Sequence, residues 1–164
     1  KGVTRSFLYS NALFWLKYFH VDGFRVDAVS NIIYYLGNPD NGVNEGACEF
    51  LRGLSRLLFA YDDRVLLMAE DSSAHEGVTR PVDMGGLGFD YKWDMGWMHD
   101  TLEYFRMPPK ERTTHYHKLT FSMYYFYFER FLMPLSHDEV VHGKGTIINK
   151  IYGEYEEKLE IINA

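Results

Sequence analysis

Hydrophobic residues at the start of the chain recur every three or four positions, a spacing that predicts an amphipathic helix from about Arg5 to His20. One stripe of this helix is expected to be buried, and it is made of Leu8, Ala12, Trp15, Leu16 and Phe19. The first element of the chain is therefore predicted to pack one face against a core.

Three later segments also have helical periodicity. Asn44 can cap a helix that runs to Tyr61, and Asp94 can cap another that Pro108 would stop. A longer helix is expected over residues 111–130, with apolar residues on one side.

Short apolar segments between these helices predict strands. Residues 24–28 alternate apolar and polar, whereas residues 65–69 are continuously apolar, as in a strand buried on both faces. Two further strands are expected near residues 88–90 and over residues 131–135. Because strands alternate with helices, we expect parallel βαβ units in one α/β domain over residues 1–164, without an interdomain linker.

Carboxylates stand at the ends of three predicted strands: Asp27, Glu70 and Asp138. In a barrel of parallel strands those ends converge on the face where catalytic residues collect. Arg25 lies two residues before Asp27 on the same face of its strand, so that its charge can keep Asp27 ionised. Two carboxylates in different environments are the minimum for retaining glycoside chemistry.

Composition excludes several other classes of function. The net charge of -6 argues against a nucleic-acid partner, and no apolar run has the length of a membrane span. Cys48 is the single cysteine, so it is interpreted as a packing residue, and a reducing, cytoplasmic location is expected. The first five residues lead into a helix rather than a signal peptide.

Several motifs together resemble the α-amylase superfamily. The segments DGFRVDAV (22–29), MAED (68–71) and LSHDE (135–139) resemble its fourth-, fifth- and seventh-strand signatures. The longer runs RPVDMGGLGFDYKW (80–93), MGWMHDTL (95–102) and LSHDEVVHGK (135–144) resemble the glycogen branching enzymes. This resemblance implies part of a (β/α)8 barrel, about strands four to seven with their helices, forming the carboxyl-terminal half of the catalytic domain.

The resemblance also implies a role for each matched residue. Asp27 would attack the anomeric carbon of an α-1,4-glucan, while Glu70 would protonate the leaving O4 and then deprotonate the O6 hydroxyl of an acceptor, giving an α-1,6 branch. Asp138 and His137 would hold sugar hydroxyls, and Arg25 would belong to the same substrate site. The partner would be glycogen or amylose, with no metal or organic cofactor.

Other interpretations of the same residues stay open. The three acids would also serve a glucan hydrolase that uses water as acceptor, and the chain could be a non-catalytic fragment. Tyr91 and Trp93 could stack on glucose rings or belong to the core. A metal site around His137 and His142 is disfavoured by their spacing. Residues 85–88 lack the Lys-Ser/Thr of a phosphate loop and are interpreted as a flexible substrate-side loop.

The superfamily's third-strand signature has no counterpart here, and neither do the first two strands or the flanking modules of branching enzymes. The chain has no initiator Met and is interpreted as starting inside a domain, with the rest of the parent enzyme missing. A half-barrel leaves strand edges unpaired. We therefore expect the isolated chain to be inactive, or active only when joined to the missing part.

Overall fold

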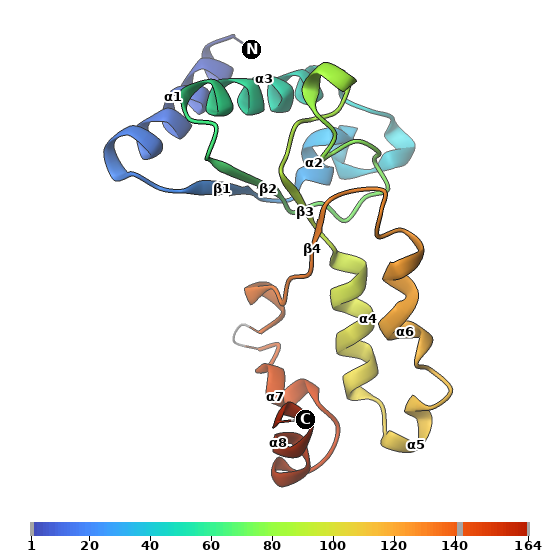
Figure 1. Ribbon diagram of the computed structural model, residues 1–164. Helices are drawn as coiled ribbons and strands as arrows, with labels where there is room; N and C mark the ends of the chain where they lie inside the picture. Colours follow the sequence, from blue (N-terminus) through green and yellow to red (C-terminus); the bar gives the residue numbers. More distant parts are fainter. Residues whose placement is uncertain (1, 141–142, 164) are drawn as a thin grey trace. The chain divides into compact units, whose positions relative to one another are not determined.

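The computed structural model describes residues 2–140 and 143–163 and divides into two compact units (Figure 1). Unit 1 extends to Trp93 and includes Phe128–Leu132. Unit 2 comprises Asp94–Tyr127 and the residues from Met133 onward. In the part of the chain described, no helix is both long and apolar enough to cross a membrane.

Unit 1 is built on a four-stranded sheet in which every neighbouring pair is parallel, as predicted. In sheet order the strands are β1 (Gly23–Val26), β2 (Leu66–Ala69), β3 (Tyr91–Trp93) and β4 (Phe131–Leu132). The α/β class with a parallel sheet is confirmed.

Two strands differ from their predicted positions. β3 begins at Tyr91, just after the predicted segment 88–90, because Gly88 has a φ of 81° and cannot continue an extended strand. β4 ends at Leu132 instead of residue 135. Pro134 has no N–H to donate to a ladder, and the neighbouring β3 is itself only three residues long.

Two helices, α1 (Gly2–Phe19) and α3 (Glu45–Tyr61), lie side by side over the sheet (Figure 1). Leu67 and Ala69 of β2 are fully buried in a core with residues of both helices. Their neighbours in β2 point the other way, and Leu66 is 45% exposed. The prediction of a strand buried on both faces is therefore wrong, and one face of the sheet is more open than the other.

Helix α1 is confirmed, but its predicted stripe is not buried. Of those five residues only Leu16 is buried, while Leu8, Trp15 and Phe19 are exposed. The helix instead packs on α3 through Tyr9, whose ring stacks on Phe50 at 5.2 Å and whose hydroxyl donates to the Phe50 carbonyl. Helix α3 follows its prediction, with the Asn44 side chain accepting from the Ala47 N–H.

Short elements connect the strands and helices of unit 1: α2 (Val29–Ile33), η1 (Tyr35–Gly37), η2 (Pro39–Asn41) and η3 (Val82–Met84). Residues 85–88 were expected to form a flexible loop, yet the segment before β3 packs onto α3. Leu87 and Phe89 are buried, and Ser55 Oγ donates to the Leu87 carbonyl at 2.7 Å. The loop is therefore part of the core of unit 1.

Unit 2 is helical. Its elements are α4 (Met95–Arg106), α5 (Pro109–Arg112), α6 (His117–Thr120), η4 (Phe121–Tyr124), η5 (His137–Glu139), α7 (Ile147–Lys150) and α8 (Tyr155–Asn163). Helix α4 begins as predicted, since the Asp94 carboxylate accepts from the Trp97 N–H at 2.8 Å.

The single helix predicted over residues 111–130 is wrong, because α5, α6 and η4 divide the segment. The break follows from competing hydrogen bonds: the Glu111 carbonyl contacts the Thr114 hydroxyl and His115 Nδ1 at 2.9 Å each. A run of aromatic residues with poor helix propensity follows. The rings of His115 and His117, two positions apart in the sequence, lie 5.9 Å apart in this broken segment.

Candidate active site

The register of β1 and β2 brings two predicted site residues next to each other. Val26 is paired with Ala69, so Asp27 and Glu70 leave adjacent parallel strands at the same level. The ladder continues past both strands, with the Glu70 N–H donating to the Val26 carbonyl at 3.0 Å and the Val29 N–H to the Glu70 carbonyl at 2.8 Å. Backbone hydrogen bonds therefore hold together the two segments that carry Asp27 and Glu70.

Arg25 lies between the two acids. Its Nη1 is 2.8 Å from Asp27 Oδ1 and also forms an ion pair with Glu70 Oε2. The two acids differ in exposure, since the Asp27 side chain is 72% exposed and that of Glu70 is 16% exposed. Arg25 is thus the ion-pair partner of both the exposed Asp27 and the mostly enclosed Glu70.

The chain turns sharply after Asp27. Ala28 has φ 45° and ψ 51°, in the left-handed region that residues with a side chain rarely adopt. Strained backbone of this kind is found preferentially at functional sites, where the surrounding structure maintains it. Here the frame of hydrogen bonds to Glu70 surrounds the turn.

Two aromatic residues of β3 share the sheet face that carries Arg25. Tyr91 is paired with Met68, which is paired with Arg25, and Trp93 is two positions further on. The Arg25 guanidinium carbon is 5.0 Å from the centre of a Trp93 ring. Tyr91 is 39% exposed, so it is not a core residue, and its role in substrate binding stays a prediction.

A buried ion pair fixes the chain after Glu70. Lys92 Nζ lies 2.8 Å from Asp71 Oδ2, and these side chains are only 6% and 0% exposed. Lys92 also donates to the Ser73 carbonyl, and Asp71 accepts from the Ser73 N–H and hydroxyl. A buried ion pair is stable only when further hydrogen bonds of this kind satisfy its remaining atoms.

His75 is partly buried beside this pair, with its ring 6.0 Å from that of Tyr34. Burial lowers the pKa of His75 below 6.5, and the charge of Lys92 lowers it further, while Asp71 opposes the change. The neutral imidazole is therefore the favoured form in the folded protein.

Asp138 and His137 belong to unit 2, where they occupy η5. The Ser136 hydroxyl accepts from the Asp138 N–H, and His137 Nε2 lies 3.1 Å from Asp138 Oδ1. Both side chains are exposed. Asp138 is not at a strand end as expected, because β4 stops at Leu132.

No group of three or more His, Cys, Asp or Glu side chains that could hold a metal ion is found within residues 2–140 and 143–163. His142, one of the two histidines weighed for such a site, lies outside the described residues.

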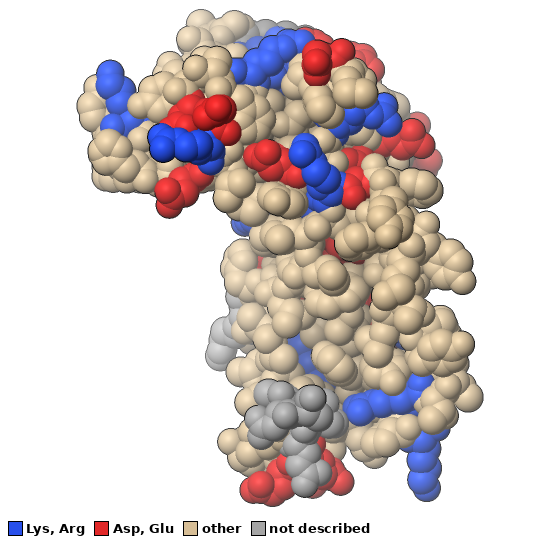
Figure 2. Space-filling view, in the orientation of Figure 1, with Lys and Arg blue, Asp and Glu red and all other residues tan. Residues whose placement is uncertain are grey.

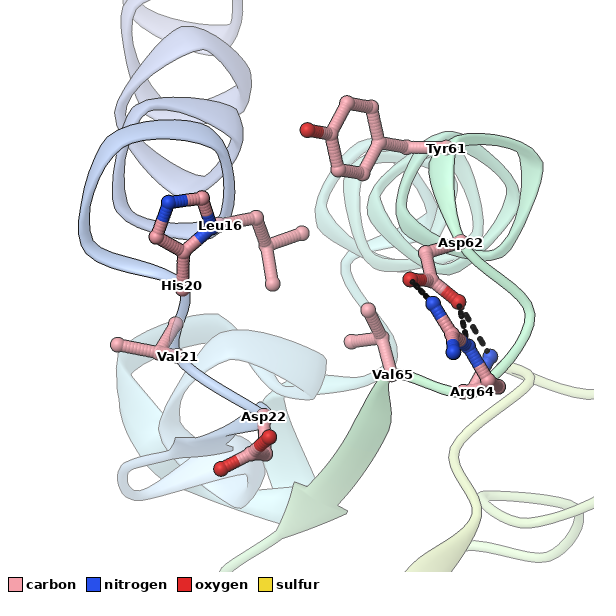
Figure 3. Close-up of a pocket in the computed structure, with 8 residues that line it drawn as sticks. All are labelled: Leu16, His20, Val21, Asp22, Tyr61, Asp62, Arg64 and Val65. Carbon is pink, nitrogen blue, oxygen red and sulfur yellow. Dashed lines mark hydrogen bonds and ion pairs between the residues drawn. The ribbon is translucent and has the colours of Figure 1, made fainter.

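A pocket of about 380 Å³ lies at the opposite, amino-terminal end of β1 and β2 (Figure 3). Asp22 and Val65, which directly precede these strands, line it together with Leu16, His20, Val21, Tyr61, Asp62 and Arg64. Hydrogen bonds from Arg64 lower the pKa of Asp62 to about 2. The pocket is thus separated from Asp27 and Glu70 by the length of the strands.

On the face of unit 1 that is drawn in Figure 2, charge is mixed rather than gathered by sign. Figure 2 shows acidic and basic side chains side by side on the face drawn.

No family model matches the chain, but almost its whole length is similar to curated proteins. Over 158 residues, 96% of this chain, it is 55% identical to the 1,4-alpha-glucan branching enzyme GlgB of Bacillus caldolyticus. It is 54% and 52% identical over the same share to the enzymes of the same name from Geobacillus stearothermophilus and Bacillus cereus strain B4264. By sequence, the chain matches a segment of the 1,4-alpha-glucan branching enzymes. It spans about a quarter of the length of these curated relatives, 24 to 25%.

Sequence reasoning missed three contacts that lie around Glu70 in this chain. The pair of Arg25 with Asp27 was expected, but the second pair with Glu70 was not. The contact of Arg25 with Trp93 and the buried pair of Lys92 with Asp71 were missed as well. A signal was present, because Lys92 is a charged residue inside a strand and Asp71 directly follows Glu70.

Proposed function

We propose that this chain carries part of the active site of a retaining transglycosylase. The enzyme would cleave an α-1,4-glucan and transfer the released chain to a glucose O6, forming an α-1,6 branch in glycogen. The observation that carries the proposal is the cluster at the ends of β1 and β2, where Arg25 contacts both the exposed Asp27 and the enclosed Glu70.

In the first step Asp27 attacks C1 of the glucose residue at the cleavage point, and the bond from C1 to O4 breaks. Glu70 gives its proton to O4, and a covalent glycosyl-Asp27 ester remains. A nucleophile needs an ionised and accessible carboxylate, in keeping with the Arg25 contact and the 72% exposure of Asp27. The general acid has to carry a proton when the glycosidic bond breaks, and Glu70 is the more enclosed of the two carboxylates.

In the second step an acceptor glucan replaces the departed chain. Glu70, now ionised, takes the proton from the acceptor O6 hydroxyl, and O6 attacks C1. The ester bond to Asp27 breaks, so both carboxylates return to their starting forms. Arg25 compensates negative charge on whichever carboxylate is ionised, because it contacts both.

We infer the remaining roles from the matched motifs. Asp138 and His137 would hydrogen-bond hydroxyls of the sugar at the cleavage point, and Tyr91 would contact the glucan. Residues 1–164 would supply strands four to seven of a (β/α)8 barrel, as the carboxyl-terminal half of a catalytic domain. The open sheet face with Arg25 and Trp93 would then face the barrel interior. A cytoplasmic location stays a prediction from the single cysteine.

A chimaera tests this proposal. The aligned 158-residue segment of the Bacillus caldolyticus relative is replaced by that of the present chain, and branches formed on amylose are counted after debranching. We expect new α-1,6 linkages with little reducing sugar, and a loss of at least roughly a thousandfold on Asp27→Asn. Asp40→Asn, at an exposed position in η2, is the matched control and should retain activity.

Other products would favour the alternatives. Reducing sugar without α-1,6 linkages would indicate a glucan hydrolase with the same acids. A folded chimaera whose activity is the same with and without Asp27→Asn would refute the proposed role of Asp27. The isolated 164-residue chain is expected to leave the iodine colour of amylose unchanged.

A further inference from the structure

Trp93 contacts the cation that Asp27 and Glu70 share. We propose that Trp93 is a positioning residue, whose indole face holds the Arg25 guanidinium where a single nitrogen contacts both carboxylates. This inference rests on the proposed function and deepens it, because it assigns a residue that acts through Arg25 rather than on the substrate.

The contact geometry is the first support. The guanidinium carbon lies 5.0 Å from the centre of a Trp93 ring, within the range of a cation–π interaction. Lys92 is paired with Ala69 across β2 and β3, so Trp93 follows at the level of Glu70. Arg25 thus has the indole and the two carboxylates as defined neighbours.

The arginine side chain is flexible, so a neighbouring group has to restrict the Arg25 guanidinium. Immobilising a long side chain costs free energy, because its rotamer freedom is lost. Arg25 is 27% exposed and its Nη1 has to meet two acids on neighbouring strand ends at once. A flat aromatic face restricts the guanidinium plane without competing for its hydrogen bonds.

Trp93 is itself held firmly. Its strand lies between β2 and β4, and Trp93 is paired with Leu132. The preceding residue, Lys92, is tied to Asp71 by the buried ion pair. A positioning residue needs support of this kind, since a loose platform would not fix the group that it carries.

The ring face of Trp93, not its N–H, makes the contact with Arg25. The indole Nε1 is buried and has no hydrogen-bond partner among the described residues. Phenylalanine should therefore replace tryptophan with little loss, whereas leucine removes the aromatic face. This difference separates positioning from simple filling of space.

The first test uses the 164-residue chain and needs no activity. The guanidinium ¹H–¹⁵N signals of Arg25 are assigned with Arg25→Lys, and their exchange with water is measured by NMR. We expect Trp93→Leu to remove the ring-current shift and to speed exchange roughly tenfold, while Trp93→Phe changes exchange by less than about threefold. Trp15→Leu, on α1, is the control and should leave these signals unchanged.

The second test uses the active chimaera. Trp93→Leu should lower kcat roughly tenfold with KM changed less than about twofold, and Trp93→Phe should lower kcat less than about threefold. In an Arg25→Lys background Trp93→Leu should cause no further loss, because its effect passes through Arg25.

Unchanged Arg25 signals in Trp93→Leu, or an equal kcat loss in both backgrounds, would overturn the inference. If the chimaera without these substitutions forms no branches, the proposed function fails, and the NMR measurement still decides whether Trp93 positions Arg25. If Trp93→Leu does not fold, Trp93→Phe and Trp93→Tyr keep the test open, since failure of either to preserve the Arg25 signals would contradict the role of the ring face.

Discussion

Lys92 and Asp71 form an ion pair of 2.8 Å that is almost completely buried. Asp71 directly follows Glu70 in the chain. Removing one partner would leave the other charge buried without compensation, a change that typically costs about 3 to 5 kcal/mol. We expect Lys92→Met to lower the free energy of unfolding by about that amount, measured by urea denaturation of the 164-residue chain. Adding Asp71→Asn should restore part of the loss, because asparagine can still accept from Ser73.

Lys110→Met is the control for this pair, since Lys110 is exposed on α5. It should change the free energy of unfolding by less than about 0.5 kcal/mol. Equal losses in Lys92→Met and Lys110→Met would mean that the pair does not stabilise the chain around Glu70.

Glu129 holds the loop that follows the candidate site. Its carboxylate accepts from the N–H groups of Gly77, Val78 and Thr79 at 2.6, 2.9 and 2.7 Å, and from the Thr79 hydroxyl. These three residues are buried, so Glu129→Ala leaves their donors unpaired away from water. We expect unfolding free energy to fall by about 3 kcal/mol or more.

Glu129→Gln separates charge from shape at this position. Glutamine keeps one acceptor oxygen, so Glu129→Gln should lower the free energy of unfolding less than Glu129→Ala does. The exposed neighbour Glu76 gives the matched control, and Glu76→Ala should have little effect on the urea midpoint. If Glu76→Ala and Glu129→Ala shift that midpoint equally, the role of the Glu129 carboxylate is refuted.

The local chemistry of this chain was predictable where one residue decides the structure. Asn44 and Asp94 cap the helices that they were expected to cap, because a cap needs only one side chain and the next turn. The strand ends at Asp27 and Glu70 were also predicted, since an alternating segment reaches Asp27 and an apolar run ends at Glu70.

What the sequence did not reveal depends on neighbours far along the chain. Arg25 and Glu70 are 45 positions apart, and only the β1–β2 register brings them into contact. The buried stripe of α1 was wrong because burial depends on which face meets α3. The helix expected over residues 111–130 failed because Thr114 and His115 compete for backbone acceptors, an effect that periodicity does not record.

His75 should make stability depend on pH. Burial lowers its pKa in the folded chain below 6.5, so protonation favours the unfolded state. Its neutral form therefore contributes stability fully above pH 6.5, and this contribution is lost as the pH falls through the lowered pKa. Urea denaturation of the wild type below pH 6.5 should show a loss that His75→Gln lacks, with a limit of about 1.4 kcal/mol per pH unit for one proton.

The comparison of the same two proteins at pH 8 is the control, because His75 is neutral in both states there. The difference in unfolding free energy between wild type and His75→Gln could instead be the same at every pH from 5 to 8. That result would show that the substitution acts through a lost contact and not through the titration of His75.

Two adjacent glycines, Gly85 and Gly86, should respond differently to alanine. A Cβ at Gly86 would meet the Arg80 carbonyl oxygen, a backbone atom that cannot rotate away, and Gly86 is buried next to the core residue Leu87. Gly85 has open space around it, but its φ of 86° strains any residue with a side chain. Gly86→Ala should therefore lower the unfolding free energy by about 3 kcal/mol, through overpacking, and Gly85→Ala by about 1 to 2 kcal/mol, through strain. Calorimetric melting of both variants tests this order, and the reverse order would mean that the loop does not pack on Arg80 as the structure has it.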